Sequence, residues 1–259
     1  MSSPALACDA VSKTFGGLRA IDAVTLAVPS GALCALIGPN GAGKTTLFNV
    51  ATNLFAPTSG AVSFFGENAA GLTPQRIAAR GVVRTFQTAR VFPGMTTLEN
   101  IMVGAHLRLR SPALAQMLWT RKSRREELRL AAKADELLDL VGLRQFGDLA
   151  ATALPIGAQK LVEIARALMS HPRLLLLDEP AAGLNERETA ELAVLLRAIC
   201  DAGMTIMVVE HNMSLVMGVA DTVFVLDAGR LIASGSPRDV QRHPAVIEAY
   251  LGRGTERRS

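Results

Sequence analysis

Apolar residues in this chain occur both in short uninterrupted runs and in longer segments with helical spacing. Ala32–Ile37, Leu174–Leu177 and most of Met204–Glu210 are runs of the first kind, which predict strands buried on both faces of a sheet. Asn185–Cys200 is of the second kind and predicts a helix. Because such strands and helices alternate in both flanks of the chain, we expect an α/β fold.

The other elements follow from the same periodicities and from glycine and proline turns. Further strands are expected at Leu6–Val11, Leu18–Val28, Ala61–Phe65, Val82–Gln87, Thr222–Leu226 and Leu231–Ala233, and further helices at Thr46–Val50, Pro74–Arg80, Thr96–Arg110, Ser123–Leu140 and Gly157–Met169. The middle third is therefore rich in helices. This shift predicts a helical subdomain over residues 90–165, inserted into an α/β core of residues 1–89 and 166–252, with a loose polar tail at 253–259.

Composition narrows the function classes. Hydrophobic residues make up 49% of the chain, yet no uninterrupted apolar stretch approaches the roughly 18 residues of a membrane-spanning helix. The segment Met1–Lys13 has no basic start or long apolar middle, so no secretory signal is expected. The 3 cysteines, Cys8, Cys34 and Cys200, lie far apart, which indicates reduced thiols in the cytosol. The net charge of +4 is too small to indicate a nucleic-acid binder.

A glycine-rich loop between the first buried run and the next helix carries the strongest chemical signal. It matches the pattern G-x-x-x-x-G-K-[ST] and reads Gly38-Pro39-Asn40-Gly41-Ala42-Gly43-Lys44-Thr45-Thr46. Its glycines let consecutive backbone N–H groups face a polyphosphate at the N-terminus of a helix. Lys44 would bridge the β- and γ-phosphates, and the Thr45 hydroxyl would bind Mg²⁺. The alternative is a glycine turn that binds nothing; taken with the motifs below, the loop predicts binding of a nucleoside triphosphate.

Two carboxylates, Asp178 and Glu179, come directly after the leucine run and precede Pro180. They are expected at the carboxyl edge of the sheet, where ligands bind in open α/β folds. Asp178 suits a magnesium ion, and Glu179 suits the base that orients or deprotonates the attacking water. The alternative is a pair of carboxylates that caps the start of a helix.

Three further residues are ambiguous when each is taken alone. Phe15 stands beside a glycine pair in a predicted hairpin or loop, where local packing and stacking on a purine ring are equally consistent with its position. Gln87 ends a predicted strand, where a glutamine is normally solvated. His211 follows a predicted strand and can reach the same sheet edge, where its imidazole would hydrogen-bond the γ-phosphate, although an isolated histidine is more often structural.

Together these residues resemble the ATP-binding subunits of ABC transporters over almost the whole chain. The resemblance assigns the Walker A loop to Gly38–Thr46, the Walker B strand to Leu174–Pro180, the Q-loop to Gln87, the D-loop to Gly183–Asn185, the switch histidine to His211 and the adenine-stacking aromatic to Phe15. It implies a P-loop NTPase (ABC-type) core with an antiparallel β-subdomain and an inserted α-helical subdomain. It also implies ATP and Mg²⁺ as cofactors, catalysis by Lys44, Gln87, Glu179 and His211, and a metal held by Thr45, Gln87 and Asp178.

The signature loop departs from the family pattern L-S-G-G-Q and reads Leu154-Pro155-Ile156-Gly157-Ala158-Gln159-Lys160. Gly157 keeps the close backbone approach to phosphate, whereas Pro155 lacks the serine hydroxyl and Ala158 replaces the glutamine. The contact with a partner's ATP is expected to be weaker by about 1–3 kcal/mol, the scale of a lost charge-assisted hydrogen bond, unless Gln159 or the partner compensates.

Subfamily details resemble the branched-chain amino-acid importer group, with urea and amide importers as a related alternative. The segments that carry this resemblance are Phe15–Ala20, Arg84–Gln87, Pro180–Asn185 and Val246–Gly252. The resemblance implies an ATPase at the cytoplasmic face of the inner membrane, paired head to tail with a second ABC ATPase subunit, which is a paralogue or the chain itself. Its other partners would be membrane-spanning permease subunits and, indirectly, a periplasmic solute-binding protein.

Two other functions stay open at this point. One is a soluble ABC ATPase that acts on nucleic acid or ribosomes, although the chain has neither a coiled-coil arm nor a second ATPase half. The other is a module that senses ATP and barely hydrolyses it, which the presence of Glu179 and His211 argues against.

Basic residues crowd the segment 108–129 and leave a further question open. They are Arg108, Arg110, Arg121, Lys122, Arg124, Arg125 and Arg129. A solvated helix face and a contact with lipid headgroups or the membrane subunit are both consistent with this pattern.

Overall fold

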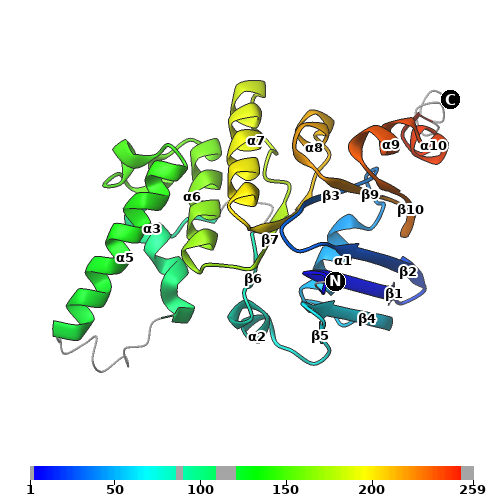
Figure 1. Cartoon of the computed structure of the whole chain (residues 1–259), viewed down its shortest axis with the longest axis horizontal. Coiled ribbons are helices and arrows are strands. Elements are labelled where there is room, and N and C mark those ends of the chain that lie inside the picture. Colours follow the sequence, from blue (N-terminus) through cyan, green and yellow to red (C-terminus); the bar gives the residue numbers. More distant parts are fainter. Residues whose placement is uncertain (1–2, 86–89, 109–120, 252–259) are drawn as a thin grey trace. The chain divides into compact units, whose positions relative to one another are not determined.

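The computed structural model describes residues 3–85, 90–108 and 121–251, and the chain separates into two compact units. The first unit comprises Met1–Arg84, Arg173–Ala182 and Thr189–Ser259, and the second comprises Thr85–Pro172 and Gly183–Glu188. Figure 1 shows that the first unit contains both sheets, whereas the second is built from helices. The fold is thus α/β with an antiparallel sheet and a helical part, as predicted.

The larger sheet of the first unit is mainly parallel. Its strands lie in the order β10-β9-β3-β8-β7-β6, with the bounds β3 Leu33–Ile37, β6 Val82–Arg84, β7 Leu174–Asp178, β8 Thr205–Val209, β9 Thr222–Asp227 and β10 Arg230–Gly235. Every residue of β3, β7 and β8 is buried, as their uninterrupted apolar runs predict. The strands from β9 to β6 pair in parallel, so their carboxyl ends meet at one edge of the sheet.

The smaller sheet is antiparallel and has the strand order β2-β1-β4-β5. Its bounds are β1 Leu6–Phe15, β2 Leu18–Val28, β4 Ser59–Phe64 and β5 Glu67–Asn68. β1 runs past the predicted end at Val11, because Thr14 pairs with Arg19 and Phe15 pairs with Leu18. The glycine pair therefore forms the turn of a hairpin, and Phe15 is the last residue of a strand.

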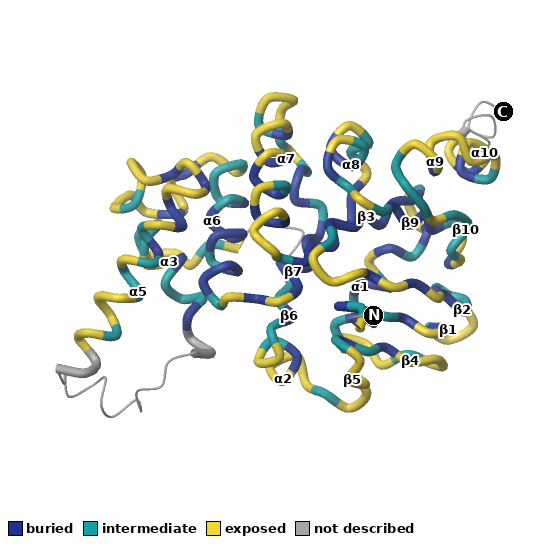
Figure 2. The backbone as a smooth tube through the Cα atoms, viewed as in Figure 1, coloured by how far each residue is buried: buried dark blue, intermediate teal, exposed yellow. Residues whose placement is uncertain are grey.

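Helix α1 (Lys44–Ala51) supplies the apolar side chains that join the two sheets of the first unit. Leu47 and Phe48 are buried in one core cluster with residues of β1, β2 and β4 and with Leu36 and Phe224 of the parallel sheet. Leu36 lies in β3 and Phe224 in β9, and Figure 2 shows these two strands as mostly buried. Because buried residues of both sheets pack against α1, the position of Lys44 at the start of the helix is fixed relative to both sheets.

Other helices of the first unit are short, apart from α7. They are α2 Pro74–Ala79, α7 Glu186–Asp201 (whose first three residues belong to the second unit), α8 Met213–Val219, α9 Pro237–Arg242 and α10 Pro244–Leu251. The sequence predicts no helix after His211, whereas the structure has α8, α9 and α10 there. Capping residues mark two of them, because the side chain of Asn212 accepts a hydrogen bond from Leu215 N and that of Ser236 accepts one from Asp239 N.

The second unit contains α3 Thr97–Met102, η1 Val103–Arg108, α5 Arg121–Leu140, η2 Arg144–Phe146, η3 Ala151–Ala153 and α6 Ile156–Met169. The prediction of one helix from Thr96 onward is wrong, because the α-helix ends at Met102 and a 3₁₀ turn follows. A β-carbon on Gly104 would lie 1.9 Å from the carbonyl oxygen of Arg166. The backbone at Gly104, two residues after the end of α3, therefore packs directly against the backbone of α6. None of the described helices has the length and apolar character needed to cross a membrane.

Candidate nucleotide-binding and hydrolysis site

The glycine-rich loop joins β3 to α1, as the sequence predicts. Gly38 has φ +153°, and a β-carbon there would lie 2.1 Å from the carbonyl oxygen of Leu226 in β9. Gly43 has φ +100°, and a β-carbon there would lie 2.7 Å from the carbonyl oxygen of Ala20 in β2. Packing against two strands therefore requires these glycines, independently of any ligand.

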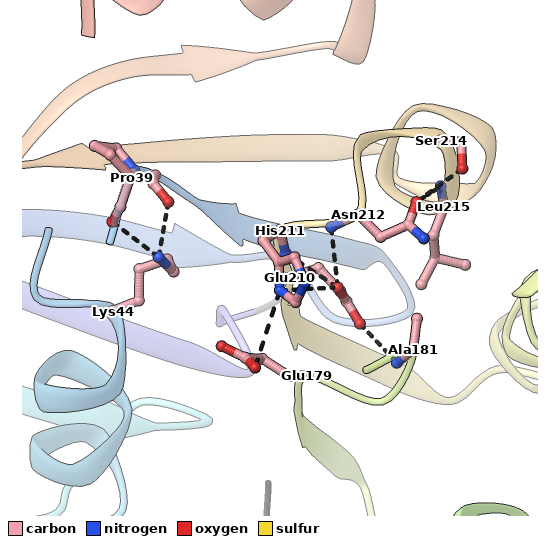
Figure 3. A network of polar contacts seen from close by, with 10 residues as sticks. Pro39, Lys44, Glu179, Ala181, Glu210, His211, Asn212, Ser214 and Leu215 are labelled. Atoms are coloured by element: carbon pink, nitrogen blue, oxygen red, sulfur yellow. Dashed lines mark hydrogen bonds and ion pairs between the residues drawn. The ribbon is translucent and has the colours of Figure 1, made fainter. Parts of the chain in front are cut away.

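Lys44 is the first residue of α1 and is 8% exposed. Its Nζ donates hydrogen bonds to the carbonyl oxygens of Gly38 at 2.7 Å and Pro39 at 3.0 Å (Figure 3). Burial lowers the pKa of Lys44, and the negative charges of Glu179 and Asp178 act in the opposite direction. The structure thus places the lysine and both carboxylates near one another at the carboxyl edge of the sheet.

The other loop residues differ in their access to solvent. Thr45 and Asn40 are exposed together with Gly41, whereas Ala42 is buried. Pro39 and Thr46 are half-buried. The Thr45 hydroxyl stands in the first turn of α1, so it is accessible to a phosphate or a metal ion that reaches the loop.

Asp178 is the last residue of β7 and is 4% exposed. Its Oδ2 forms an ion pair with Arg84 Nη2 at 2.7 Å. Arg84 ends the neighbouring strand β6, and its Nη1 also donates to Asn49 Oδ1 at 2.6 Å and Thr52 Oγ1 at 3.2 Å in and after α1. The guanidinium therefore connects the carboxylate to the helix that carries Lys44.

Glu179 follows Asp178 and has φ +48°, a left-handed conformation that is uncommon for a residue with a side chain. Its N–H donates to the carbonyl oxygen of Val209 at 2.9 Å. Glu179 Oε2 lies 3.9 Å from His211 Nδ1, which is longer than a hydrogen bond. The side chains of Glu179 and His211 are 21% and 58% exposed, so both are more accessible than Asp178.

Phe15 forms the edge of an exposed aromatic pair. The residue is 42% exposed, and its ring meets the Phe55 ring edge to face, with centroids 5.4 Å apart and planes at 82°. Lys13 Nζ lies 5.1 Å from the Phe15 centroid and 5.8 Å from that of Phe55. Phe15 is therefore not a core residue, and its role in stacking on adenine stays a prediction.

Gly157 stands in the first turn of α6, behind Pro155 as the N-cap residue. A β-carbon on Gly157 would lie 3.0 Å from Leu184 Cδ2 and 3.2 Å from Glu188 Oε1. The glycine thus leaves room for the side chains of Leu184, in the predicted D-loop, and of Glu188 in α7, in addition to its predicted approach to phosphate. Gln159 Nε2 donates to the carbonyl oxygen of Leu154 at 2.8 Å, so its amide is engaged within the loop.

Sequence analysis missed the roles of Arg84, Glu210 and Tyr250, which the structure brings to the site. Glu210 is fully buried between the segments that carry Glu179 and His211. Burial raises the pKa of Tyr250 in α10, and a hydrogen bond to the backbone of Gly38 lowers it in part. Arg84 lies in a predicted strand and Tyr250 in a segment that carries the subfamily resemblance, and no sequence signal locates the partners of either residue.

Gln87 and Arg110 lie outside the described residues, so the predicted Q-loop role stays a prediction. Three of the basic residues on α5 are exposed, namely Arg124, Arg125 and Arg129. Their exposure is consistent with a solvated helix face and equally with a contact to lipid headgroups or the membrane subunit.

The chain matches the ABC transporter family over residues 21–182 and the branched-chain amino acid ATP-binding cassette transporter family over residues 230–256. It is 42% identical over 253 residues to the high-affinity branched-chain amino acid transport ATP-binding protein BraF of Pseudomonas aeruginosa, covering 97% of this chain and 99% of the relative. It is 41% identical over 253 residues, with the same coverage, to the protein LivG of Escherichia coli, which bears the same description.

Solved structures agree with these relatives. A nucleotide-free ATP-binding cassette from an ABC transporter has 32% sequence identity and a TM-score of 0.82, covering 95% of this chain and 98% of that chain. The ADP conformation of MJ1267, an ATP-binding cassette of an ABC transporter, has 31% identity and a TM-score of 0.83, covering 97% and 100%. With the glycine loop, the carboxylate strand and the histidine at one sheet edge, the chain belongs to the ATP-binding proteins of ABC transporters, in the branched-chain amino acid transport group.

Proposed function

We propose that this chain is the ATP-hydrolysing subunit of an importer for branched-chain amino acids. The observation that carries the proposal is the arrangement at one sheet edge. Lys44 starts the helix after β3, Asp178 ends β7 and Glu179 follows it, and His211 comes after β8. The relatives BraF and LivG, described as branched-chain amino acid transport ATP-binding proteins, support the class of solute. The C-terminal family match carries the same description.

Each side chain has one task in hydrolysis of the γ-phosphate. Lys44 exchanges its two carbonyl partners for phosphate oxygens, which are stronger acceptors because they are charged. Glu179 orients and deprotonates the attacking water, and its exposure exceeds that of Asp178 as this task requires. His211 donates a hydrogen bond to the γ-phosphate from the neighbouring position.

The residues present fit a magnesium ion that is bound together with the nucleotide. Asp178 and the Thr45 hydroxyl offer the oxygen ligands that Mg²⁺ prefers. The described residues contain no cluster of three or more acidic, histidine or cysteine side chains that would hold a metal by themselves. This suits an ion that takes its other ligands from phosphates and water. When bound, the ion would neutralise charge that develops on the phosphate oxygens.

The proposal includes a head-to-tail pair of ATPase subunits attached to membrane-spanning permeases at the cytoplasmic face. In that pair, the start of α6 would meet the nucleotide of the partner. Pro155 provides no side-chain hydrogen bond at this helix start, which supports a weaker contact than a serine would make. A partner subunit of different sequence would compensate for this loss.

Purification of the membrane complex through a tag on this chain tests the proposal. In proteoliposomes, leucine, isoleucine and valine are expected to stimulate ATP hydrolysis and to be taken up, whereas glutamate is not. A complex with Glu179→Gln serves as the matched control and should show neither activity. Stimulation by urea or short amides instead would contradict the solute class. Co-purification of ribosomes or nucleic acid without membrane subunits would contradict the importer function.

A further inference from the structure

Glu210 is a carboxylate with no exposed surface, placed directly after β8. Its Oε1 accepts a hydrogen bond from the backbone N–H of Ala181 at 2.7 Å. Its Oε2 accepts hydrogen bonds from the backbone N–H groups of His211 at 3.0 Å and Asn212 at 3.1 Å. Figure 3 shows the carboxylate between these two segments of backbone.

In all three contacts an oxygen of the Glu210 side chain is the acceptor and a backbone N–H is the donor. A buried polar group is unfavourable unless hydrogen bonds satisfy it, and three N–H groups do so here. A glutamine of the same shape has one acceptor oxygen and two N–H donors. Whichever way the amide is turned, its NH₂ group would face at least one backbone N–H, so one of the two segments would lose its attachment.

The two segments are the ones that carry the candidate base and the candidate switch histidine. Ala181 lies two residues after Glu179, whose φ of +48° needs support from its surroundings. On the other side, the Asn212 side chain accepts hydrogen bonds from Leu215 N at 3.1 Å and Ser214 Oγ at 2.7 Å and so caps α8. Glu210 thus fixes the backbone of His211 between the end of β8 and the start of a helix.

The distances connect this attachment to the catalytic pair. His211 Nδ1 lies 3.9 Å from Glu179 Oε2 and 4.0 Å from Glu210 Oε2. One buried carboxylate therefore joins the turn after β7 to the backbone of His211, whose imidazole lies close to both Glu179 and Glu210. An apolar residue at this position would fill the space but would leave three backbone N–H groups without these acceptors.

We propose that Glu210 is a positioning residue for ATP hydrolysis, which acts by holding His211 against Glu179. The inference rests on the proposed ATPase function of the same site. Glu210 touches no substrate atom in this account, so its loss should lower the rate of hydrolysis and leave nucleotide binding through the Lys44 loop intact.

The test compares Glu210→Gln with Asp221→Asn in the full complex, at saturating ATP. Asp221 is the matched control, because its Oδ2 also accepts a backbone N–H, that of Leu33 at 2.8 Å, at the opposite end of β3. We expect Glu210→Gln to lower kcat about 10- to 100-fold, the scale of a misplaced catalytic group, with a nucleotide Kd within about threefold of wild type. Asp221→Asn should change kcat less than about twofold.

A double variant separates positioning from general damage. In a His211→Ala background, under single-turnover conditions, Glu210→Gln should lower the rate by a smaller factor than in the wild-type background, because the histidine that it positions is absent. If that background is too slow to measure, the imidazole resonance of His211 in ¹⁵N-labelled protein serves instead, and it should shift in Glu210→Gln and stay unchanged in Asp221→Asn.

Three results would overturn the inference. They are a wild-type kcat in Glu210→Gln, an equal fractional loss with and without His211, and an unmoved His211 resonance. Failure of the importer function is a separate outcome, since it would appear as ATP hydrolysis by the wild-type complex without stimulation by solute.

Discussion

The buried ion pair between Arg84 and Asp178 gives the most quantitative prediction for stability. In Arg84→Met the aliphatic stem is kept, while the guanidinium is lost from its 2.7 Å contact with Asp178 and from its hydrogen bonds to Asn49 and Thr52. The two side chains of the pair are 16% and 4% exposed, so water replaces little of the lost interaction. Removing one partner of such a pair costs about 3–5 kcal/mol.

Differential scanning calorimetry measures this change. For a chain of this size a loss of about 3–5 kcal/mol lowers Tm by about 6–20 °C. Arg80→Met is the matched control, because Arg80 pairs with Glu67 at 3.3 Å and the two side chains are 39% and 67% exposed. An exposed pair contributes about 0–1 kcal/mol, so the control should lose less than about 4 °C.

Arg84→Lys gives an intermediate point, since it keeps the charge and loses the planar fork that contacts three partners. Its Tm should fall between those of wild type and Arg84→Met. The reasoning is refuted if Arg84→Met loses no more stability than Arg80→Met.

The remaining predictions concern the phosphate loop and the cysteines. Lys44→Ala should weaken binding of a fluorescent ATP analogue about 10- to 150-fold, because a hydrogen bond to a charged group contributes about 1.5–3 kcal/mol. An unchanged titration would contradict the role of Lys44 in phosphate binding. Gly38→Ala should yield little folded protein, because the added carbon would lie 2.1 Å from a main-chain oxygen of β9. In Gly41→Ala the added carbon would have no atom within 4 Å, so the free energy of unfolding should fall by only about 1–2 kcal/mol, through the φ of +81°. Equal yields and Tm values for the two variants would contradict the packing argument. Burial raises the pKa of the Cys8 and Cys34 thiols to about 12. Ellman's reagent at pH 8 should therefore leave both thiols unmodified until the protein is denatured. Rapid reaction of these two thiols in the native protein would contradict their burial.

The sequence predicted the features that depend on neighbouring residues. Uninterrupted apolar runs located β3, β7 and β8, and the loop Gly38–Thr46 located the turn before α1. The family and fold class are confirmed by the matches over residues 21–182 and by the relatives. These signals are strong because each is complete within a few residues.

What the sequence did not predict depends on partners far along the chain. Arg84 acquires its role only because β6 lies beside β7, and Glu210 only because the turn after β7 returns to β8. The break after Met102 coincides with the approach of Gly104 to the carbonyl of Arg166. Such contacts leave no local pattern, since the residues alone do not say which strands and helices become neighbours.

Hydrolysis and nucleotide binding by Glu179→Gln decide whether Lys44 binds the triphosphate while Glu179 activates the water. The variant should bind ATP and Mg²⁺ about as tightly as wild type, because the contacts of Lys44 with the loop do not involve Glu179. Its turnover should fall about 10²–10⁴-fold, the contribution of a positioned base. Turnover close to that of wild type would show that Glu179 is not the base that activates the water.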